Sequence, residues 1–175
     1  MANNLYINGI ERALKPGWSH TKKLNTELDT ALIMIPKTEE FDIEPMDEAR
    51  IDTTYFYVST IRRKIASFAP VKKWNYTIGL VSPTIRLQRI ILPNRSITQR
   101  FRGTKLTIYD VLLRYKSIYA PWAEFSYNLQ LKTQNVVCPE FQWTQPTLFE
   151  VFNDLLKVVN CVVTMPTYTQ ISVLD

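Results

Sequence analysis

Apolar and polar residues alternate with a period of two over several stretches in the first half of the chain, as they do in half-buried β-strands. Asn8-Gly9 favours a hairpin turn, because both residues tolerate a positive φ. Pro36 is expected to end a strand, since proline cannot donate a ladder hydrogen bond. The alternation predicts strands at residues 5–7, 24–35, 50–62 and 76–81.

The stretch 76–99 contains a break around which the other predicted elements are arranged. Ser82-Pro83 interrupts the strand that begins this stretch, because a residue before proline is held extended and proline lacks a backbone donor. A short helical turn at 84–89 and a buried strand at 90–92 are expected next. Pro93-Asn94 then predicts a turn.

Two segments of the last third begin with the pattern Thr-x-x-acid and continue with the apolar period of a helix. In this pattern the threonine hydroxyl accepts a hydrogen bond from a free amide at the helix start, and the acid three residues later returns one. The two segments begin 40 residues apart and form a weak internal repeat, Thr107 with Asp110 and Thr147 with Glu150. We therefore predict amphipathic helices at 108–119 and 148–158, the first with an apolar stripe that ends at Ile118, and we expect both to lie against a sheet. A closing pair of strands is predicted at 161–165 and 170–174.

The composition predicts one globular domain or at most two small ones. The chain has 175 residues, of which 46% are hydrophobic and 21% charged. Its apolar runs are shorter than the roughly 20 residues of a membrane-spanning helix. The N-terminus lacks the basic and apolar regions of a secretory signal, so we expect synthesis in a cytoplasm. The end at Asp175, directly after a predicted strand, suggests the front part of a longer polypeptide.

Charge is distributed unevenly along the chain, although the formal net charge is only +5. Residues 27–52 contain nine carboxylates and two cations, and residues 62–116 contain thirteen cations and one carboxylate. Such asymmetry fits a nucleic-acid surface, or a subunit whose acidic side meets the basic side of a neighbour.

The sequence offers no convincing catalytic or metal-binding set. His20 is the only histidine, and Cys138 and Cys161 are too far apart in sequence for a metal cluster. The acidic stretch 39–48 lacks the spacing of a calcium loop, and no glycine-rich phosphate loop is present. Nothing in the sequence brings Glu124 and Glu140 together as a hydrolase pair. We expect no enzymatic activity and no cofactor.

A basic arm follows the predicted turn at Pro93-Asn94. It could contact nucleic acid, or it could be a loop that contacts a neighbouring subunit or faces the lumen of a ring. The acidic first third and the lack of a known nucleic-acid motif favour the second alternative. The arm contains Phe101 and the four cations Arg95, Arg100, Arg102 and Lys105.

In the order of these elements, the chain resembles the N-terminal part of bacteriophage tail hub proteins, which include tail-associated proteins of long-tailed phages and the central hub of contractile baseplates. The resemblance covers nearly the whole chain and depends on the pattern and order of the predicted elements and short motifs, and not on one decisive motif. Besides the first strands and the first capped helix, it is carried by Ile43-Glu44-Pro45, Ser82-Pro83-Thr84, Leu92-Pro93-Asn94, Phe141-Gln142-Trp143 and Pro146-Thr147-Leu148.

The resemblance implies an α+β fold, mainly β, with β-barrel-like antiparallel sheets and two flanking helices at about 108–119 and 148–158. It implies a barrel domain of tail-hub type at 1–100. Residues 101–175 would form a helix-strand-helix-strand region packed on that domain, or the start of a second one. The resemblance implies assembly as a trimer in which two similar barrels per subunit imitate a sixfold ring. This chain is shorter than hub proteins usually are.

The resemblance further implies a structural virion protein, a baseplate or tail-tip hub that acts in tail assembly. Its expected partners are copies of itself in a homotrimer and the distal tail, tube and tape-measure proteins, without a membrane or a specific nucleic acid. The alternative function is a nucleic-acid-binding module that uses the basic segment 86–116. The predicted interface residues are Glu39, Glu40 and Glu44 on the acidic side and Arg95, Arg100, Arg102 and Lys105 on the basic side.

Overall fold

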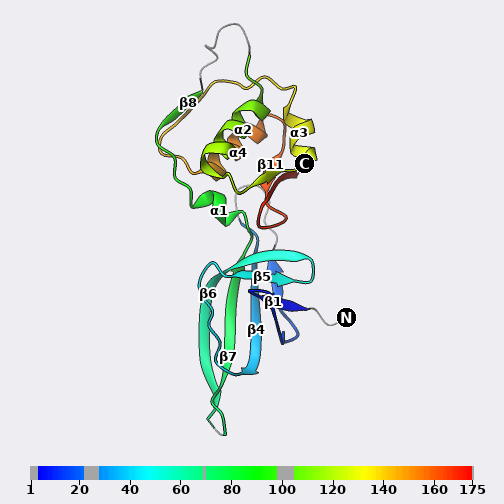
Figure 1. The fold of residues 1–175 in the computed structure, drawn as a ribbon, viewed down its shortest axis with the longest axis vertical. Coiled ribbons are helices and arrows are strands. Elements are labelled where there is room, and N and C mark those ends of the chain that lie inside the picture. Colours follow the sequence, from blue (N-terminus) through cyan, green and yellow to red (C-terminus); the bar gives the residue numbers. More distant parts are fainter. Residues whose placement is uncertain (1–3, 22–27, 69, 98–104, 175) are drawn as a thin grey trace. The chain divides into compact units, whose positions relative to one another are not determined.

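The structure, a computed structural model, describes residues 4–21, 28–68, 70–97 and 105–174. The chain divides into two compact units, an N-terminal unit at 1–83 and a C-terminal unit at 84–175 (Figure 1). The division follows Pro83, where the sequence predicts that a strand must stop. It therefore comes earlier than the predicted domain limit at residue 100.

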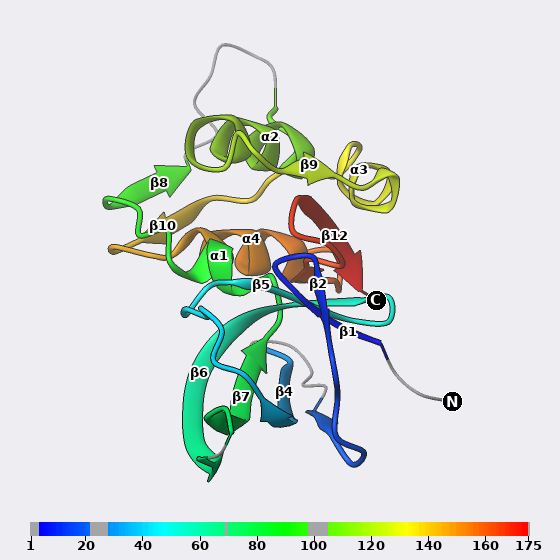
Figure 2. The ribbon, with the colours of Figure 1, turned by 60° about the horizontal axis from the view of Figure 1, so that its bottom comes forward.

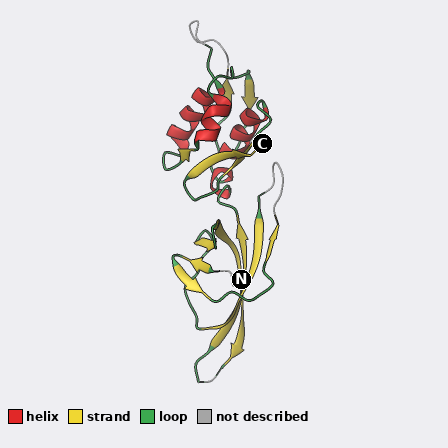
Figure 3. Ribbon diagram, turned by 90° about the vertical axis from the view of Figure 1, so that its right-hand side faces the viewer, coloured by secondary structure: helices red, strands yellow, loops and turns green. Residues whose placement is uncertain are grey.

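A single antiparallel sheet makes up most of the N-terminal unit. Its seven strands lie in the order β2-β1-β5-β6-β7-β4-β3. Their bounds are β1 Leu5–Ile7, β2 Ile10–Arg12, β3 Ser19–Thr21, β4 Thr30–Thr38, β5 Glu48–Ile51, β6 Thr54–Ser67 and β7 Lys73–Val81. The strands β6 and β7 form a long hairpin whose closed end projects beyond the other strands of this unit (Figures 1 and 3).

The core of the N-terminal unit lies on one face of this sheet, as the alternating sequence predicts. Ile33 and Ile35 of β4 are buried, and each lies directly opposite a buried residue of β7, Ile78 and Tyr76. The residues that alternate with them face the other side, where Leu32 is 50% and Met34 41% exposed. The two-residue period thus sets the register, because a slip by one residue would move the whole apolar set into water.

The sheet confirms the predicted class, α+β and mainly β, but it is not closed into a barrel. The strands at its two ends, β2 and β3, pair only with β1 and β4 among the described residues. Both are three residues long. Short edge strands limit pairing with other chains without closing the sheet.

Several strands differ from those predicted. The expected strand at 50–62 is two strands, because the chain turns at Asp52, which has a φ of 53° and accepts a hydrogen bond from the Asn4 amide at 2.9 Å. β4 continues past Pro36 to Thr38 across a bulge, a site that tolerates a proline. The expected strand at 90–92 is only an isolated bridge from Ile91 to Thr147.

The C-terminal unit contains the helices and three small β pairings. The helices are α1 Ile85–Gln88, α2 Ile108–Tyr119, α3 Tyr127–Thr133 and α4 Leu148–Lys157. The strands are β8 Arg95–Ile97, β9 Glu124–Phe125, β10 Phe141–Trp143, β11 Val162–Thr164 and β12 Gln170–Leu174. The strands β8 and β10 pair at one end of the unit, and α3 lies beside β12 at the other (Figure 2).

The two predicted helices form α2 and α4, and both begin with the predicted capping box. In α2 the Asp110 amide donates to the Thr107 hydroxyl at 3.2 Å, while the Thr107 amide donates to the Asp110 carboxylate at 3.0 Å. The same pair of bonds joins Thr147 and Glu150 in α4. The short helical turn expected at 84–89 forms α1. The helix α3 is additional, since its seven residues are too few to produce a clear apolar period.

The apolar stripe of α4 is buried as predicted, whereas that of α2 ends one turn early. Phe152 and Leu155 of α4 are fully buried. Ile118, the last residue of the predicted α2 stripe, is 60% exposed. We expected each helix to lie against a sheet, but only α4 does so, on β11, and α2 packs on α4.

Candidate interaction surfaces

Two carboxylates of the predicted acidic interface form ion pairs inside the N-terminal unit. Glu39 accepts a hydrogen bond from the Lys73 ammonium at 3.0 Å, and Glu40 pairs with the guanidinium of Arg63. All four side chains are partly exposed, so each pair contributes little to stability. The pairs nevertheless join the segment after β4 to Arg63 of β6 and Lys73 of β7.

Phe41 anchors this acidic segment on the core. The centre of its ring lies 4.7 Å from that of the Tyr76 ring, and the guanidinium carbon of Arg12 lies 4.1 Å from the centre of the Phe41 ring. Ile43 also packs against the core. Alternating anchors thus leave the carboxylates between them at the surface.

The segment ends in a turn that we call the acidic turn, defined by Asp42, Glu44, Asp47 and Glu48. The Glu44 amide donates to the Asp47 carboxylate at 2.8 Å, and the Asp47 amide donates back to the Glu44 carbonyl at 3.1 Å. The backbone of the turn also bonds to Val58 of β6, at 2.7 Å from Met46 and 2.9 Å to Asp47. The turn is therefore fixed beside the first third of β6.

The opposite end of β6 belongs to a feature that we call the basic hairpin, residues 62–73. It contains five cations and no carboxylate. Near its end Phe68 is 74% exposed and Val71 50% exposed. The Trp74 ring beside them lies under two of the cations, with the Lys72 ammonium 4.4 Å and the Arg63 guanidinium 5.3 Å from its centroid. The sequence shows these cations, but not that β6 and β7 present them together.

One edge of β6 lacks a paired strand along most of its length. β5 pairs only with Thr54–Tyr57, and beyond Val58 no strand of the described chain joins that edge. Bulges at Ser59 and Ala66, together with the exposed Arg62 and Lys64, are features that protect open edges from pairing with other chains.

The predicted basic arm lies only partly within the described residues. Arg95 is in β8, which pairs with β10, so that Arg95 lies opposite Trp143. Lys105 is exposed. Arg100 and Arg102 lie outside the described residues, and the structure does not test their role.

Other cations of the segment 86–116 contribute to packing in the C-terminal unit. The Arg86 guanidinium lies 3.5 Å from the centre of the Trp122 ring and donates to the Tyr168 carbonyl at 3.1 Å. The Lys116 ammonium lies 6.0 Å from the centre of the Phe125 ring. These two cations therefore stabilise the unit itself, whereas Arg89 and Arg114 are exposed.

The side chains considered for catalysis remain apart. His20 lies between aromatic rings, 6.1 Å from Trp18 and 5.2 Å from Phe56. Glu124 in β9 and Glu140 before β10 are both exposed. Within the described ranges, no three His, Cys, Asp or Glu side chains gather as metal ligands. The described helices include none with the length and apolar character to cross a bilayer.

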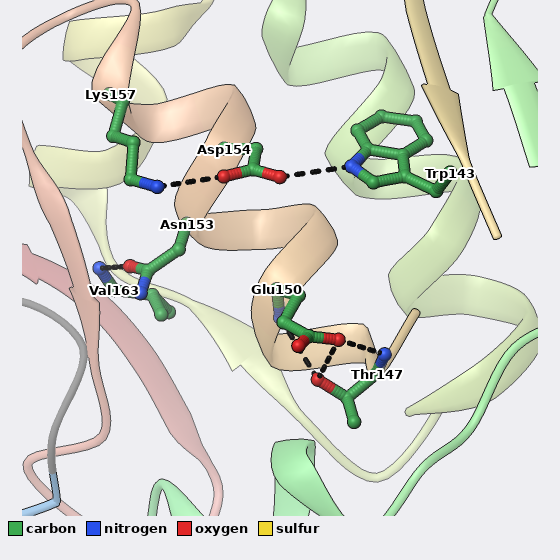
Figure 4. A network of polar contacts seen from close by, with 7 residues as sticks. All are labelled: Trp143, Thr147, Glu150, Asn153, Asp154, Lys157 and Val163. Carbon is green, nitrogen blue, oxygen red and sulfur yellow. Dashed lines mark hydrogen bonds and ion pairs between the residues drawn. The ribbon is translucent and has the colours of Figure 1, made fainter. Parts of the chain in front are cut away.

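A polar network that the sequence did not predict connects α4 to its neighbours (Figure 4). The Asp154 carboxylate accepts from the Trp143 indole at 3.0 Å and from the Lys157 ammonium at 2.8 Å. Burial raises the pKa of Asp154, but these two hydrogen bonds and the charge of Lys157 together lower it by more, so that the net shift is downward. Asn153 accepts from the Val163 amide at 3.0 Å. The network fixes β10 and β11 to the helix.

The fold matches those of several solved tail proteins. A tail protein from Neisseria meningitidis MC58 superposes with a TM-score of 0.65 at 11% identity, over 98% of this chain and 49% of that one. The 43 kDa tail protein of prophage MuSo2 from Shewanella oneidensis superposes with a TM-score of 0.62 at 12% identity, over 99% and 52%.

A component of the Escherichia coli type VI secretion system, described as structurally similar to the T4 bacteriophage tail proteins gp27 and gp5, also matches. Its TM-score is 0.57 at 12% identity, over 98% of this chain and 48% of that one. The chain thus spans about half the length of the solved structures it matches. No protein-family model and no curated protein sequence matches it. Over nearly its whole length, the chain has the fold of phage tail proteins and of their type VI secretion relative.

Proposed function

We propose that the chain is a structural component of a bacteriophage tail, a baseplate or tail-tip hub that connects the tail tube with the distal tail. The observation that supports this most strongly is the superposition of 98% and 99% of the chain on two tail proteins. At identities of 11% and 12%, the fold is retained where little of the sequence is. A function that depends on shape is consistent with such retention.

In this proposal the protein assembles as a homotrimer in the virion, after synthesis in the host cytoplasm, and contacts distal tail, tube and tape-measure proteins. Its function is assembly and not bond-making catalysis. The basic arm, with Arg95, Arg100, Arg102 and Lys105, contacts a neighbouring tail protein. Glu44 lies at a contact between copies, while Glu39 and Glu40, through their ion pairs, hold the segment that presents it.

The test is removal of the protein from the phage or prophage that encodes it. We expect particles without attached tails in electron micrographs, and we expect mass spectrometry to find the protein in purified wild-type particles. The variant R100E/R102E should reduce the yield of complete particles. Infectious particles with normal tails after complete removal would overturn the proposal.

A nucleic-acid-binding module based on residues 86–116 predicts a different result. The purified protein would be retained on DNA, and its affinity would fall steeply as salt concentration rises. We expect no retention at physiological salt, partly because Arg86 and Lys116 already lie against aromatic rings of the protein.

A further inference from the structure

The two ends of strand β6 carry opposite charge. Glu48, in the acidic turn, lies opposite Tyr57 near one end of the strand, and Lys73, in the basic hairpin, lies opposite Ser67 at the other. A strand rises about 3.3 Å per residue, so Tyr57 and Ser67 are on the order of 30 Å apart along β6. At that separation, the two charged ends of one molecule cannot contact each other.

At the basic end, the charge is only partly neutralised within the molecule. Arg63 and Lys73 pair with Glu40 and Glu39. The other three cations of the basic hairpin form no ion pair with any described residue, and these are Arg62, Lys64 and Lys72. Phe68 and Val71 are exposed near the closed end of the same hairpin, so the hairpin carries both exposed apolar side chains and positive charge without an ion pair in the described chain.

At the other end, the acidic turn has the complementary features. Asp42, Glu44, Asp47 and Glu48 form no ion pair within the part of the chain that the structure describes. An exposed apolar side chain lies nearby as well. Ile10 of β2 is 56% exposed and pairs with Ile7 of β1. Ile7 in turn pairs with Ala49 of β5, the neighbour of Glu48 in the sequence. Two strand spacings, about 10 Å, separate Ile10 from Ala49.

We propose that the basic hairpin of one copy of this protein docks on the acidic turn of the next copy. Arg62, Lys64 and Lys72 would face the carboxylates of the turn, and Phe68 and Val71 would pack toward Ile10. Because each copy uses two different surfaces, the contact is head-to-tail, and repeating it closes a ring if the rotation between copies allows. This inference rests on the self-assembly in the proposed function and names the surfaces that perform it.

A second copy accounts for more of the structure than another partner does. An anionic membrane would attract the basic hairpin and its apolar end, but it would repel the acidic turn. Nucleic acid would do the same. Only a partner with both kinds of charge satisfies both ends of β6, and the chain itself is such a partner.

The test measures self-association of the full chain by sedimentation velocity across a range of protein and salt concentrations. We expect an oligomer whose dissociation constant rises with salt, because screening weakens contacts between exposed charges. The hairpin variant R62E/K64E/K72E and the turn variant D42K/E44K/E48K should each weaken association about tenfold or more. Asp47 is left unchanged, because its carboxylate accepts the Glu44 amide.

Combining both sets of substitutions in one chain should restore association, because the two surfaces are again complementary. The matched control K15E/R89E/R114E changes the net charge as much as the hairpin variant does, at three exposed cations outside it, and should leave association unchanged. The neutral variant R62Q/K64Q/K72Q should weaken association less than the reversal does and serves if the reversal fails to fold.

An oligomer that both reversals leave intact would overturn this inference and leave the proposed function standing. A wild-type chain that stays monomeric at all concentrations would overturn the self-assembly on which both depend. Binding to vesicles of phosphatidylglycerol that the hairpin reversal abolishes, with self-association unchanged, would identify the hairpin as a membrane contact and overturn the inference.

Discussion

Thr60 and Gly79 lie directly opposite each other on β6 and β7, and the Thr60 hydroxyl occupies the space that a β-carbon at position 79 would need. The Ser59 hydroxyl would also lie within 3.1 Å of that carbon. In an ordinary strand position, replacing glycine with alanine gains stability, but here steric overlap opposes the gain. We predict that Gly79→Ala lowers the free energy of unfolding by about 1–3 kcal/mol, measured by urea denaturation.

The control is the same substitution in a Thr60→Ala background. Removing the hydroxyl should relieve most of the overlap, so that Gly79→Ala then costs little. The difference between the two backgrounds is the coupling energy of the pair. An equal cost in both backgrounds would show that the Thr60 side chain does not cause the loss of stability at residue 79.

The capping threonines should contribute measurably to stability. Thr147→Ala removes the acceptor for the Glu150 amide, and Thr107→Ala removes that for Asp110. Each should cost about 1 kcal/mol, the usual cost of losing an N-cap. Thr→Ser at the same positions should retain most of the stability, since serine keeps the hydroxyl. Thermal unfolding followed by circular dichroism measures both, and equal losses in the alanine and serine variants would contradict the assignment.

The agreement between predicted and observed elements is closest where a structure depends on neighbouring residues. The capping boxes were predicted because both partners lie within four residues of each other in sequence. The turn at Asp52 was missed, because it depends on a bond to Asn4, far away in the chain. The stripe of α2 was predicted one turn too long, since only the packing of α2 on α4 decides where burial ends.

The candidate interface shows the same limit. The sequence indicated an acidic and a basic region, but it did not show that Glu39 and Glu40 would be paired inside the molecule. Nor could it show that residues 62–73 form the end of a hairpin, because this depends on the pairing of β6 with β7. The position of each charged residue can be read from the sequence, whereas the partner with which it forms an ion pair depends on how the strands of the sheet are arranged.

The pH dependence of stability should report the downward shift of the Asp154 pKa. Burial opposes this shift, and the hydrogen bonds from Lys157 and Trp143 outweigh it. A carboxyl whose pKa is lower when folded stabilises the protein above its unfolded pKa, near 4, and loses that contribution as pH falls through the folded pKa. Asp154→Asn should therefore cost up to about 1 kcal/mol at pH 7, because the carboxylate is partly exposed, and less near pH 2.

Urea denaturation of both proteins at several pH values checks this expectation. Glu11→Gln, at an exposed carboxylate, is the control and should leave the stability difference from wild type small at every pH. A constant difference between wild type and Asp154→Asn from pH 7 to pH 2 would contradict the assigned role of Asp154.

The two cysteines should be unreactive in the folded protein. Both are buried, and burial raises the pKa of Cys138 to about 11, so little thiolate forms at pH 8. Ellman's reagent should therefore label neither cysteine until denaturant is added. An introduced cysteine at the exposed Ser117 should react at once and shows that the reagent is active. Rapid labelling of the folded wild type would contradict the burial of these thiols.

Most of the buried apolar residues in the described ranges belong to two sets that share no member. One set ends with Leu80 and the other begins with Leu87, and the division between the units lies between them. Each half of the gene therefore encodes its own source of folding energy. Evolution can replace or duplicate one half, or join it to a different neighbour, without rebuilding the interior of the other.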